Sequence, residues 1–390
     1  MVSTPGDGSC GIGTYTRDVC DAFDGVETET LPIAQEERTA AHFAALALRA
    51  MADSADVVHV QHEYGLFRRD GSDYPGVFGL VFFGILGVLN LLRRKRVVVT
   101  FHSVLKPTPE EARFGVRLYL QCMHYLLAAV SDHLVFLSEE CAERFERDVK
   151  LDADDGSVFS HGVNTAKTAD VTQAAAKRRF GYDPDTPVVA IPGFIRPPKG
   201  HDVFVQVAEL LPDIEFLVAG GARPKGEDFE FAERIAERAP ENVTVTGVLD
   251  DEEFPVALAA PDLMVLPYRV VTQSGTFNWC AAQERPVLAS DVPYFRHIEC
   301  EWGALETVAV DDPEAVAERI ERLLSDEDRL ATLRRNVRRY KQRNSFDNVA
   351  ADHAKLYRTL LSGSENADHG TPTPPMRAAC SARPSASADD

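Results

Sequence analysis

The residues best suited to chemistry lie in a polar turn, Gln273-Ser274-Gly275, between two apolar runs. The runs at 263–266 and 287–290 have the length of buried strands, and the segment between the turn and the second run suits a helix. Strand, turn, helix and strand make one βαβ unit of a parallel sheet. The turn would place backbone N–H groups and a hydroxyl at a helix N-terminus, which suits an anion such as a diphosphate.

Two cations, Arg196 and Lys199, occupy a similar position earlier in the chain. They follow an apolar run at 188–191 and precede a helix expected at 201–211. Arginine can bind two oxygens of an anion with its planar fork, whereas lysine acts as a point charge. A pair of solvated loop cations is the alternative, but the end of a strand in an acidic chain favours a binding role.

Further candidates follow strand ends in the first half of the chain. Gly11 and Gly13 form a Gly-x-Gly turn that lets backbone N–H groups approach an anion, although an ordinary tight turn would also use them. His102 closes the strand expected at 97–101 and should face a ligand site, unless it is a structural histidine. Glu63 ends another strand, and for this residue the structural interpretation is equally good.

His59, His62 and Glu63 resemble a metal cluster only superficially. Residues three apart on a strand point to opposite faces, so these side chains cannot chelate one ion together unless the strand ends between them. We therefore predict no metal site of this kind. A divalent ion could still accompany a diphosphate without dedicated protein ligands.

The elements that must position these residues alternate along almost the whole chain. Strands are expected at 56–61, 97–101, 133–138, 188–191, 214–219, 243–246, 263–266 and 287–290. Helices are expected at 14–23, 38–53, 113–129, 201–211, 229–238, 252–259 and 313–324, with two more in succession over 326–361. Repeated βα units predict parallel sheets with helices on both faces, and ligands bind beyond the C-terminal ends of such strands.

The domain organisation follows from length and from composition shifts. A chain of 390 residues is long for one core, so two domains are expected. Residues 165–187 have little apolar periodicity and end in Pro/Asp turns, which predicts a linker, and the Ser-, Pro- and Ala-rich residues 362–390 predict a disordered tail. Residues 1–5 resemble only the end of a strand, so we expect the true start to lie upstream or the first strand to be truncated.

The charge and the cysteines exclude several classes of protein. Lys and Arg total 41 against 61 Asp and Glu, a net charge of −20, which is unfavourable for nucleic-acid binding and fits a salt-adapted cytoplasm. The seven cysteines are scattered, which argues for reduced thiols and against a disulfide frame or a zinc site. The first residues show no signal peptide, so a cytoplasmic location is expected.

The segment 76–92 is apolar on all sides, and the basic residues 93–96 follow it. It is short for spanning a bilayer, and a core strand follows directly, so burial is favoured. The alternative is a peripheral membrane contact through residues 76–96, in which the basic end meets anionic lipid.

Several short motifs occur in a characteristic order. They are GIGTYT at 11–16, DVVHVQHEYG at 56–65, VTFH at 99–102, SHGVN at 160–164, GFIRPPKG at 193–200, VLPY at 265–268 and QSG at 273–275. Together they make the chain similar to the GT-B retaining glycosyltransferases of family 4 over nearly all of residues 2–361. The resemblance implies an α/β fold with two tandem Rossmann-like domains facing a central cleft.

The resemblance also implies a role for each part of the chain. Residues 1–164 would form the acceptor-side domain, 165–187 the linker, 188–343 the nucleotide-sugar domain and 344–361 a helix that crosses back to the first domain. The activity would be retaining transfer of a sugar from a nucleoside-diphosphate donor to a saccharide, glycan or lipid-linked acceptor. The donor is a substrate, and no tightly bound cofactor is implied.

Particular residues would carry this reaction. Arg196 and Lys199 would stabilise the departing diphosphate, and His102 would lie beside the transferred sugar. The residues expected to contact the donor are Gly11, Gly13, Gln273, Ser274, Gly275, Thr276 and Asn278. Glu63 and Tyr64 would lie on the acceptor side.

The chain departs from the family pattern at three positions. Two family glutamates, spaced eight apart, are replaced by Val271 and Trp279, and the commoner arginine position holds Phe194. Asn278 could partly replace the second glutamate. The missing carboxylates support a rival hypothesis, a non-catalytic relative that binds a nucleotide sugar or a partner enzyme. An NAD-dependent oxidoreductase ranks last, because Thr16 stands where the third glycine of its motif belongs.

Overall fold

The computed structural model describes residues 1–8, 10–34, 36–69, 76–93, 95–105, 114–152, 154–222 and 228–362. The expected disordered tail lies outside these residues, except for its first residue. The chain forms two compact units. The first contains Met1–Thr168, Val271–Ala282 and Lys341–Glu365, and the second contains Ala169–Val270 and Gln283–Tyr340.

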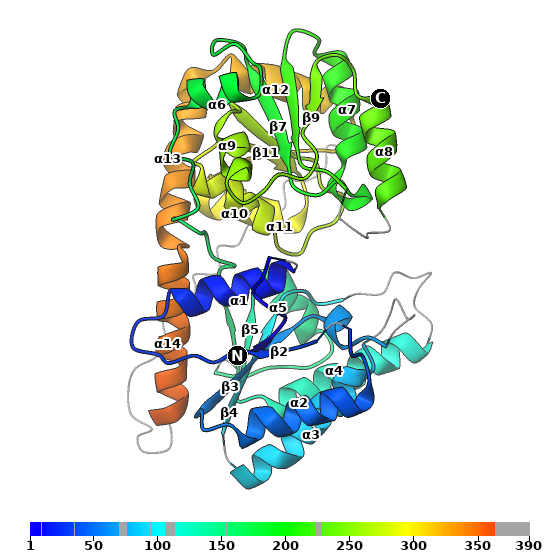
Figure 1. The fold of residues 1–390 in the computed structure, drawn as a ribbon, viewed down its shortest axis with the longest axis vertical. Coiled ribbons are helices and arrows are strands. Elements are labelled where there is room, and N and C mark those ends of the chain that lie inside the picture. The colour runs from blue at the N-terminus through cyan, green and yellow to red at the C-terminus, as the bar shows by residue number, and fades with distance from the viewer. Residues whose placement is uncertain are drawn as a thin grey trace, which may run out of the picture. The chain divides into compact units, whose positions relative to one another are not determined.

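The first unit is built on a parallel six-stranded sheet with the order β2-β1-β3-β4-β5-β6 (Figure 1). Its strands are β1 (Val2–Ser3), β2 (Leu31–Pro32), β3 (Val57–His62), β4 (Arg96–Phe101), β5 (His133–Phe136) and β6 (Gly156–Val158). Its helices are α1 (Gly11–Asp21), α2 (Ala40–Ala52), α3 (Phe78–Arg93), α4 (Phe114–Val130), α5 (Glu139–Glu146) and the 3₁₀ turn η1 (Tyr64–Phe67). This is the doubly wound architecture that the alternating pattern predicts.

Both faces of the first sheet are buried, as apolar runs without polar alternation require. Val97 and Val99 of β4 point into the main core, which α2, α3 and α4 cover on one side of the sheet (Figure 1). Val98, between them, points to the other face and belongs to a cluster with Tyr357 of α14 (Phe346–Ser362). Successive residues of one strand therefore contact different helical layers.

The second unit contains another parallel six-stranded sheet, with the order β12-β11-β10-β7-β8-β9. The strands are β7 (Val188–Pro192), β8 (Glu215–Ala219), β9 (Val243–Val245), β10 (Leu263–Leu266), β11 (Val287–Ser290) and β12 (Glu306–Val308). The helices are α6 (Gln173–Arg179), α7 (His201–Leu210), α8 (Phe229–Arg238), α9 (Glu253–Ala259), α11 (Pro293–Trp302), α12 (Pro313–Leu324) and most of α13 (Glu327–Arg343). Side chains from α7, α8, α12 and α13 fill its core together with the strands.

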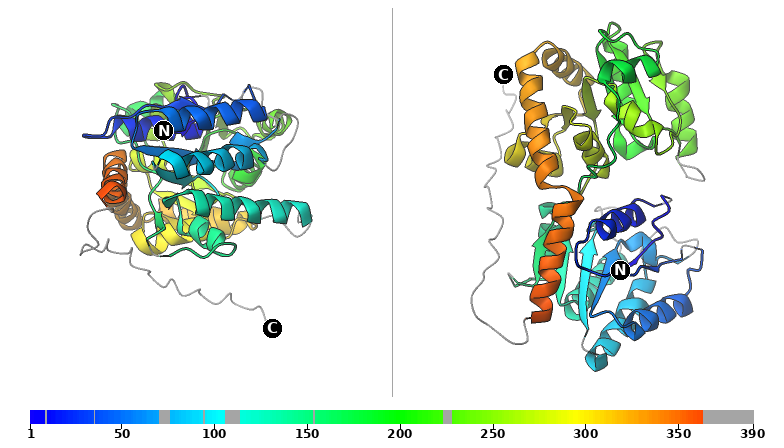
Figure 2. Two further views of the ribbon diagram at one scale, coloured as in Figure 1. Left: turned by 90° about the horizontal axis from the view of Figure 1, so that it is seen from below. Right: turned by 60° about the vertical axis from the view of Figure 1, so that its left-hand side comes forward.

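The last two helices have different partners. Leu330 and Leu333 of α13 belong to the core of the second unit. Figure 2 shows α14 (orange-red) continuing from α13 and running along the first sheet, and it also contacts α1. Its Tyr357 hydroxyl lies 2.6 Å from Nδ1 of His59 on β3, so a buried polar contact holds this helix on the sheet.

Two regions differ from the sequence expectation. Residues 173–179, within the expected linker, form α6, because Ala176 packs against Ala259 and Ala260 and the Lys177 ammonium reaches the Asp262 carboxylate at 2.8 Å. Cys10, Cys20, Cys122, Cys141 and Cys280 are free thiols, but Cys300 is disulfide-bonded, contrary to the expectation of reduced thiols. Spacing along the chain does not reveal which sulfurs meet in a fold.

The apolar segment 76–92 forms most of α3, which packs against α2 and α4. Phe82, Phe83 and Leu86 in its middle are fully buried. Its last turns are not, since Leu91 and Leu92 are 81% and 80% exposed. No helix in the described ranges is both long and apolar enough to cross a bilayer.

Candidate functional site

The order of the strands marks where each unit should bind a ligand. In doubly wound sheets, ligands bind beyond the C-terminal ends of the strands, where the order reverses. The first sheet reverses between β1 and β3, and the second between β7 and β10. The candidate residues predicted from the sequence follow these strands or their neighbours.

In the first unit, β1 leads into the turn that contains Gly11 and Gly13. A Cβ at Gly13 would lie 1.9 Å from the carbonyl oxygen of Pro5, so only glycine fits there. A Cβ at Gly11, the first residue of α1, would meet no atom within 4 Å. Gly13 therefore permits close packing of the turn, whereas Gly11 leaves the helix N-terminus open.

His102 follows β4 and is 3% exposed. Its Nε2–H donates to Oε1 of Gln61 at 2.9 Å, and its ring meets Tyr15 edge-on with centroids 5.0 Å apart. Burial lowers the pKa of His102 well below its usual value, so the imidazole is neutral. The contact to Gln61 fixes the tautomer and leaves the Nδ1 lone pair as an acceptor.

His161, in the loop after β6, joins His102 to the Gln273–Gly275 turn within the first unit. Its ring lies 5.1 Å from that of Tyr15 and 6.5 Å from that of His102, centroid to centroid. A Cβ at Gly275 would lie 3.4 Å from Cε1 of His161, so the ring packs against the start of α10 (Gly275–Ala282). Burial lowers the pKa of His161 to about 4. Sequence reasoning named His161 only as part of the SHGVN motif.

Asn278 fastens α10 to the same loop. Its Nδ2 donates to the Gly162 carbonyl at 2.8 Å and approaches Nδ1 of His161 at 3.4 Å, and the residue is 4% exposed. The amide that could replace the missing glutamate therefore makes contacts with the protein itself. Trp279, at the glutamate position, has the ammonium of Lys167 5.5 Å from its ring centroid.

Some polar groups of the Gln273–Gly275 turn form contacts within the protein, and others do not. Ser274 Oγ accepts a hydrogen bond from the Phe277 N–H at 3.0 Å, which caps α10. Oε1 of Gln273 is buried and has no hydrogen-bond partner among the described residues. Thr276 makes contacts within the protein, whereas the Gly275 N–H lies in the first turn of the helix, where N–H groups lack intrahelical partners.

The acceptor-side candidates are mostly engaged in structural contacts. Glu63 accepts from Ser103 Oγ at 2.6 Å and from the Tyr64 N–H at 3.0 Å, and burial raises the pKa of its carboxyl. Tyr64 is 2% exposed, and its hydroxyl lies 2.6 Å from Nε2 of His124. Glu63 thus joins the segments that follow β3 and β4, and Tyr64 joins the first of them to α4.

The two histidines of β3 point to opposite sides of the sheet. His59 lies within hydrogen-bond distance of Tyr357 and Thr100, whereas the His62 ring stacks on Phe67. The described part of the chain contains no group of three His, Cys, Asp or Glu side chains placed to hold a metal ion.

In the second unit, Arg196 and Lys199 lie in the loop between β7 and α7. Arg196 Nε donates to Oδ2 of Asp228 at 2.8 Å, and its side chain is 41% exposed. The Lys199 ammonium lies 5.7 Å from the ring centroid of Tyr268, which follows β10. Lys199 therefore lies at the switch point between β7 and β10, whereas Arg196 is paired with Asp228, which follows β8.

This cationic loop is held rigidly. Gly200 has a φ of +71°, and a Cβ there would lie 2.0 Å from the Pro267 carbonyl oxygen. Arg269 forks two oxygens of Asp202 at 2.8 and 2.7 Å and donates to the Pro197 carbonyl at 2.9 Å. The loops after β7 and β10 are thereby fastened together.

Sequence reasoning missed a second backbone-lined turn in this unit. A Cβ at Gly220 would lie 2.1 Å from the Gly193 carbonyl oxygen, and a Cβ at Gly221 would lie 2.8 Å from the Val248 nitrogen. The loops after β7, β8 and β9 therefore approach one another closely. Glycines directly after the strand at 214–219 were the available signal.

The class of fold is GT-B-like. The sucrose-phosphate synthase of Thermosynechococcus elongatus superimposes with a TM-score of 0.72 at 20% identity, covering 93% of this chain and 98% of that one. Anabaena HepE, solved with UDP, superimposes with a TM-score of 0.71 at 16% identity, covering 92% of this chain and 98% of that one.

A family signature covers part of the second unit. Residues 186–326 match the family Glycosyl transferases group 1. The chain is 28% identical to a D-inositol 3-phosphate glycosyltransferase of Xylanimonas cellulosilytica over 59% of its length and 58% of the relative's. It is also 28% identical to the lipopolysaccharide core biosynthesis mannosyltransferase LpsB of Rhizobium meliloti, over 53% and 61% of the two chains. The chain thus spans less than two thirds of each of these relatives.

Proposed function

We propose that this protein is a retaining glycosyltransferase of family 4, which transfers a sugar from a nucleoside-diphosphate donor to a saccharide, glycan or lipid-linked acceptor. The observation that carries the proposal is the match to group 1 glycosyltransferases over residues 186–326, which includes the cationic loop of Arg196 and Lys199. One neighbour of the same fold, Anabaena HepE, is described in separate structures with UDP and with UDP-glucose bound.

In the proposed reaction, the bond between the anomeric carbon and the diphosphate oxygen breaks, and the acceptor hydroxyl forms the new bond on the same face of the sugar. The proton of that hydroxyl passes to the departing diphosphate. Arg196 and Lys199 stabilise the negative charge that grows on the leaving group, more strongly in the transition state than in the ground state. The N–H of Gly275 contributes in the same sense.

The first unit would contribute neutral polar groups. His102 has its Nε2–H committed to Gln61, so its Nδ1 and its backbone carbonyl can accept hydrogen bonds from sugar hydroxyls. Acceptors of this kind also favour positive charge at the anomeric carbon. Gly11, Gly13, Gln273, Ser274, Thr276 and Asn278 remain proposed donor-side residues, of which Asn278 would act by holding α10 in place.

The alternative from another class is a non-catalytic relative that only binds a nucleotide sugar or a partner enzyme. It rests on Val271 and Trp279, which replace two family glutamates. The cations Arg196 and Lys199 and the buried His102 favour the enzyme.

The deciding experiment titrates the purified full-length chain with a panel of UDP-, GDP- and ADP-sugars and measures nucleotide release, first with water and then with a panel of glycan and lipid-linked acceptors. An enzyme should release nucleotide from one donor class in a manner that an acceptor accelerates. Saturable donor binding without release would support the non-catalytic alternative. Absence of both binding and release would reject both hypotheses.

We also propose a peripheral membrane contact within residues 76–96. Val88, Leu91 and Leu92 near the end of α3 are 64%, 81% and 80% exposed, and Lys95 follows them. Exposed leucines beside a cation suit an anionic lipid surface. Because α3 leads into β4, this end lies at the opposite edge of the sheet from His102, so the contact would anchor the protein.

Flotation with anionic liposomes tests this contact. The unmodified chain should float at physiological salt, and Leu91→Gln/Leu92→Gln should remain at the bottom of the gradient. The matched control Leu48→Gln changes an exposed leucine of α2, 53% exposed, and should float normally. Failure of the unmodified chain to float would reject the contact without affecting the proposed catalytic activity.

A further inference from the structure

The helices that cover one face of the first sheet carry no carboxylate. α2, α3 and α4 have 13, 16 and 17 residues, and their sequences contain neither Asp nor Glu. In the whole chain these two types make up 61 of 390 residues, about one in six. Every other helix of ten or more residues in the described ranges contains at least two. The acidic surface of the chain is therefore interrupted at this helical layer.

Apolar side chains occupy solvent-facing positions of the same layer. Nearly half of the large apolar side chains that are exposed in the described part of the chain belong to these three helices, namely Leu48, Val88, Leu91, Leu92, Phe114, Leu118 and Tyr125. Burial in the core cannot explain them, because they point away from it. Single exposed apolar side chains are ordinary, whereas a group of them on one layer marks an interaction surface.

α4 presents the most regular part of this surface, an exposed stripe of Phe114, Leu118, Cys122, Tyr125 and Ala129. Phe114 is 81% exposed and Tyr125 is 54% exposed. The spacings of four, four, three and four residues place the stripe on one side of the helix, opposite its buried residues. A helix of 17 residues is about 25 Å long, so the stripe extends over several turns.

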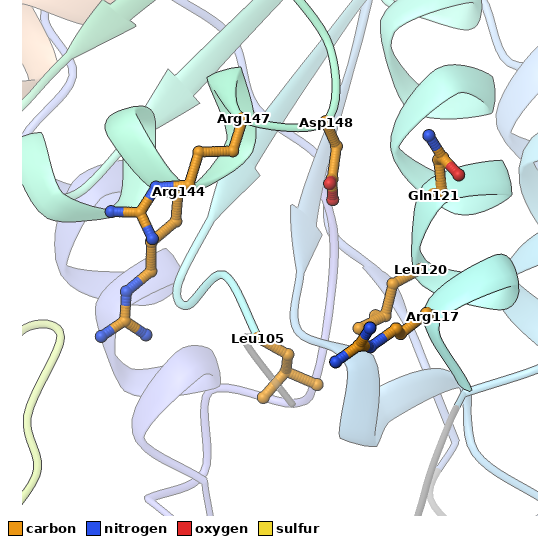
Figure 3. A pocket seen from close by; sticks show the side chains of 7 residues that line it. All are labelled: Leu105, Arg117, Leu120, Gln121, Arg144, Arg147 and Asp148. Atoms are coloured by element: carbon orange, nitrogen blue, oxygen red, sulfur yellow. The ribbon is translucent and has the colours of Figure 1, made fainter. Parts of the chain in front are cut away.

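The stripe is only one helix wide, because both of its flanks are occupied. On one flank, Arg117 and Gln121 of α4 line a hollow together with Arg144, Arg147 and Asp148, and Figure 3 shows these polar side chains around it. On the other flank, α3 packs against α4. A narrow apolar stripe at spacings of three and four residues suits contact with another helix, whereas a lipid surface favours a broad apolar face.

The stripe is complementary to itself when two copies of α4 run antiparallel. With a two-fold axis between Gln121 and Cys122, Phe114 lies opposite Ala129 of the second copy, and Leu118 lies opposite Tyr125 of the second copy. The largest side chain at the end of the stripe thus meets the smallest one, as interdigitated packing requires. A two-fold axis makes each of these pairs occur twice.

The charge of the chain also favours this face as the place where two copies meet. Two chains that each carry a net charge of −20 repel each other, and the repulsion is least where the facing surfaces carry no carboxylate. Among the described helices of ten or more residues, only α2, α3 and α4 meet that condition.

We propose that the exposed stripe of α4 is a dimer interface, in which it packs antiparallel against the same stripe of a second copy of this chain. The interface buries Phe114, Leu118 and Tyr125, and its geometry is independent of the proposed glycosyltransferase activity.

Analytical ultracentrifugation of the full-length chain at increasing concentration and salt tests the association. The chain should form a dimer at micromolar concentration, and higher salt should strengthen the dimer, because salt screens the repulsion between two acidic chains. A chain that stays monomeric at every concentration and salt would overturn the proposal.

Paired substitutions test which faces meet. Leu118→Glu/Tyr125→Glu should weaken dimerisation at least about 100-fold, because the introduced carboxylates face one another across the axis. Leu118→Lys/Tyr125→Glu should form a dimer again, since each introduced ammonium then faces an introduced carboxylate. The control Leu48→Glu changes an exposed leucine of α2 outside the stripe and should leave the dimer unchanged. Equal dimerisation of the two paired variants would contradict the antiparallel pairing.

Cys122 provides a covalent readout of the same geometry, because its exposed thiol lies next to the proposed axis. A short bismaleimide should link two copies of the unmodified chain, and Cys122→Ser should prevent the link. Cross-linking that persists in Cys122→Ser would place another surface at the interface. Circular dichroism spectra and melting temperatures equal to those of the unmodified chain check that each variant is folded.

Liposome flotation separates a second copy from a lipid surface as the occupant of the stripe. Leu118→Glu/Tyr125→Glu should float as the unmodified chain does, because Leu91 and Leu92 are unchanged. If this variant loses flotation while the unmodified chain is monomeric, the stripe contacts lipid and the dimer interface is rejected.

Discussion

The two units carry different kinds of side chain at the C-terminal ends of their strands. In the first, His102, His161 and Tyr15 are packed against one another and kept neutral by burial, which lowers the histidine pKa values and raises that of the tyrosine. In the second, Arg196 and Lys199 are charged side chains that remain partly exposed to solvent. Buried neutral groups suit hydroxyls, whereas accessible cations suit a diphosphate.

The difference has an energetic reason. A charge can be buried only with a partner, and the described strand-end groups of the first unit near His102 include no cation paired with it. The histidines therefore remain neutral, and their positions are fixed by Gln61 and Asn278. In the second unit, Asp228 and Asp202 hold the cationic loop without burying its charges.

The largest expected difference between the two units is the stability that each loses as the pH falls. Burial lowers the pKa of His59 and His102 well below the ordinary value and that of His62 to about 3. The unfolded chain therefore binds more protons than the folded one below pH 6.5, so stability falls as pH decreases through 6.5 towards the folded pKa. Between pH 7 and pH 5 this effect should cost about 2 kcal/mol for His62, and His59 and His102 should add to the loss in the same direction.

Hydrogen exchange followed by mass spectrometry at the two pH values measures this effect. Protection should fall in β3 and β4 of the first unit and persist in β7 and β10, because the described histidine with a large shift in the second unit is His201 alone, with a pKa of about 3. His59→Gln should reduce the pH dependence. Equal loss of protection in both units would break the comparison.

Removing a cation from the second unit should give the next largest effect. Lys199→Ala should lower the rate of nucleotide release about 100-fold to 1000-fold, because a fixed charge that stabilises the leaving group is lost. Steady-state kinetics with the donor found in the panel measures this loss. Arg179→Ala is the control, since Arg179 forms an exposed ion pair with Glu253 in the same unit. Unchanged turnover in Lys199→Ala would remove the cationic loop from the mechanism.

Substitutions of His102 and Gln61 in the first unit should have smaller effects on the rate of nucleotide release. His102→Ala should lower it about 10-fold to 100-fold, which corresponds to one or two lost hydrogen bonds. Gln61→Ala, which lets the imidazole adopt either tautomer, should lower it about threefold to tenfold. An unchanged rate in Gln61→Ala would show that Gln61 does not orient His102.

The longer strands and helices were predictable from the sequence, whereas the very short ones were not. The strands β10 and β11 coincide with the apolar runs expected at 263–266 and 287–290, and helix α8 coincides with 229–238. β1 and β2 have two residues each, too few for any periodicity, and the first was recognised only as a strand end. α6 was missed because its short buried face holds only Ala176 and Lys177, which give no apolar periodicity.

The sequence predicted where the candidate site residues lie relative to the strands, but not which residues they contact. Arg196, Lys199 and His102 follow strands, and the sheet order places them at C-terminal strand ends. Tyr64 was expected on the acceptor side, yet it is buried against His124. His161, which links His102 with α10, comes from a loop after a strand of three residues and gave no signal of its own.

The sequence by itself determined the alternation of strands and helices, the polar turn at 273–275, the cationic loop and the loss of two carboxylates, because residue types and spacing are local properties. Only the tertiary structure decided that Asn278 holds the His161 loop, and that Arg117, Arg144 and Arg147 share a hollow with Asp148. Those contacts join residues far apart in the chain. Their geometry is set by the packing of whole helices on the sheets, which no local pattern encodes.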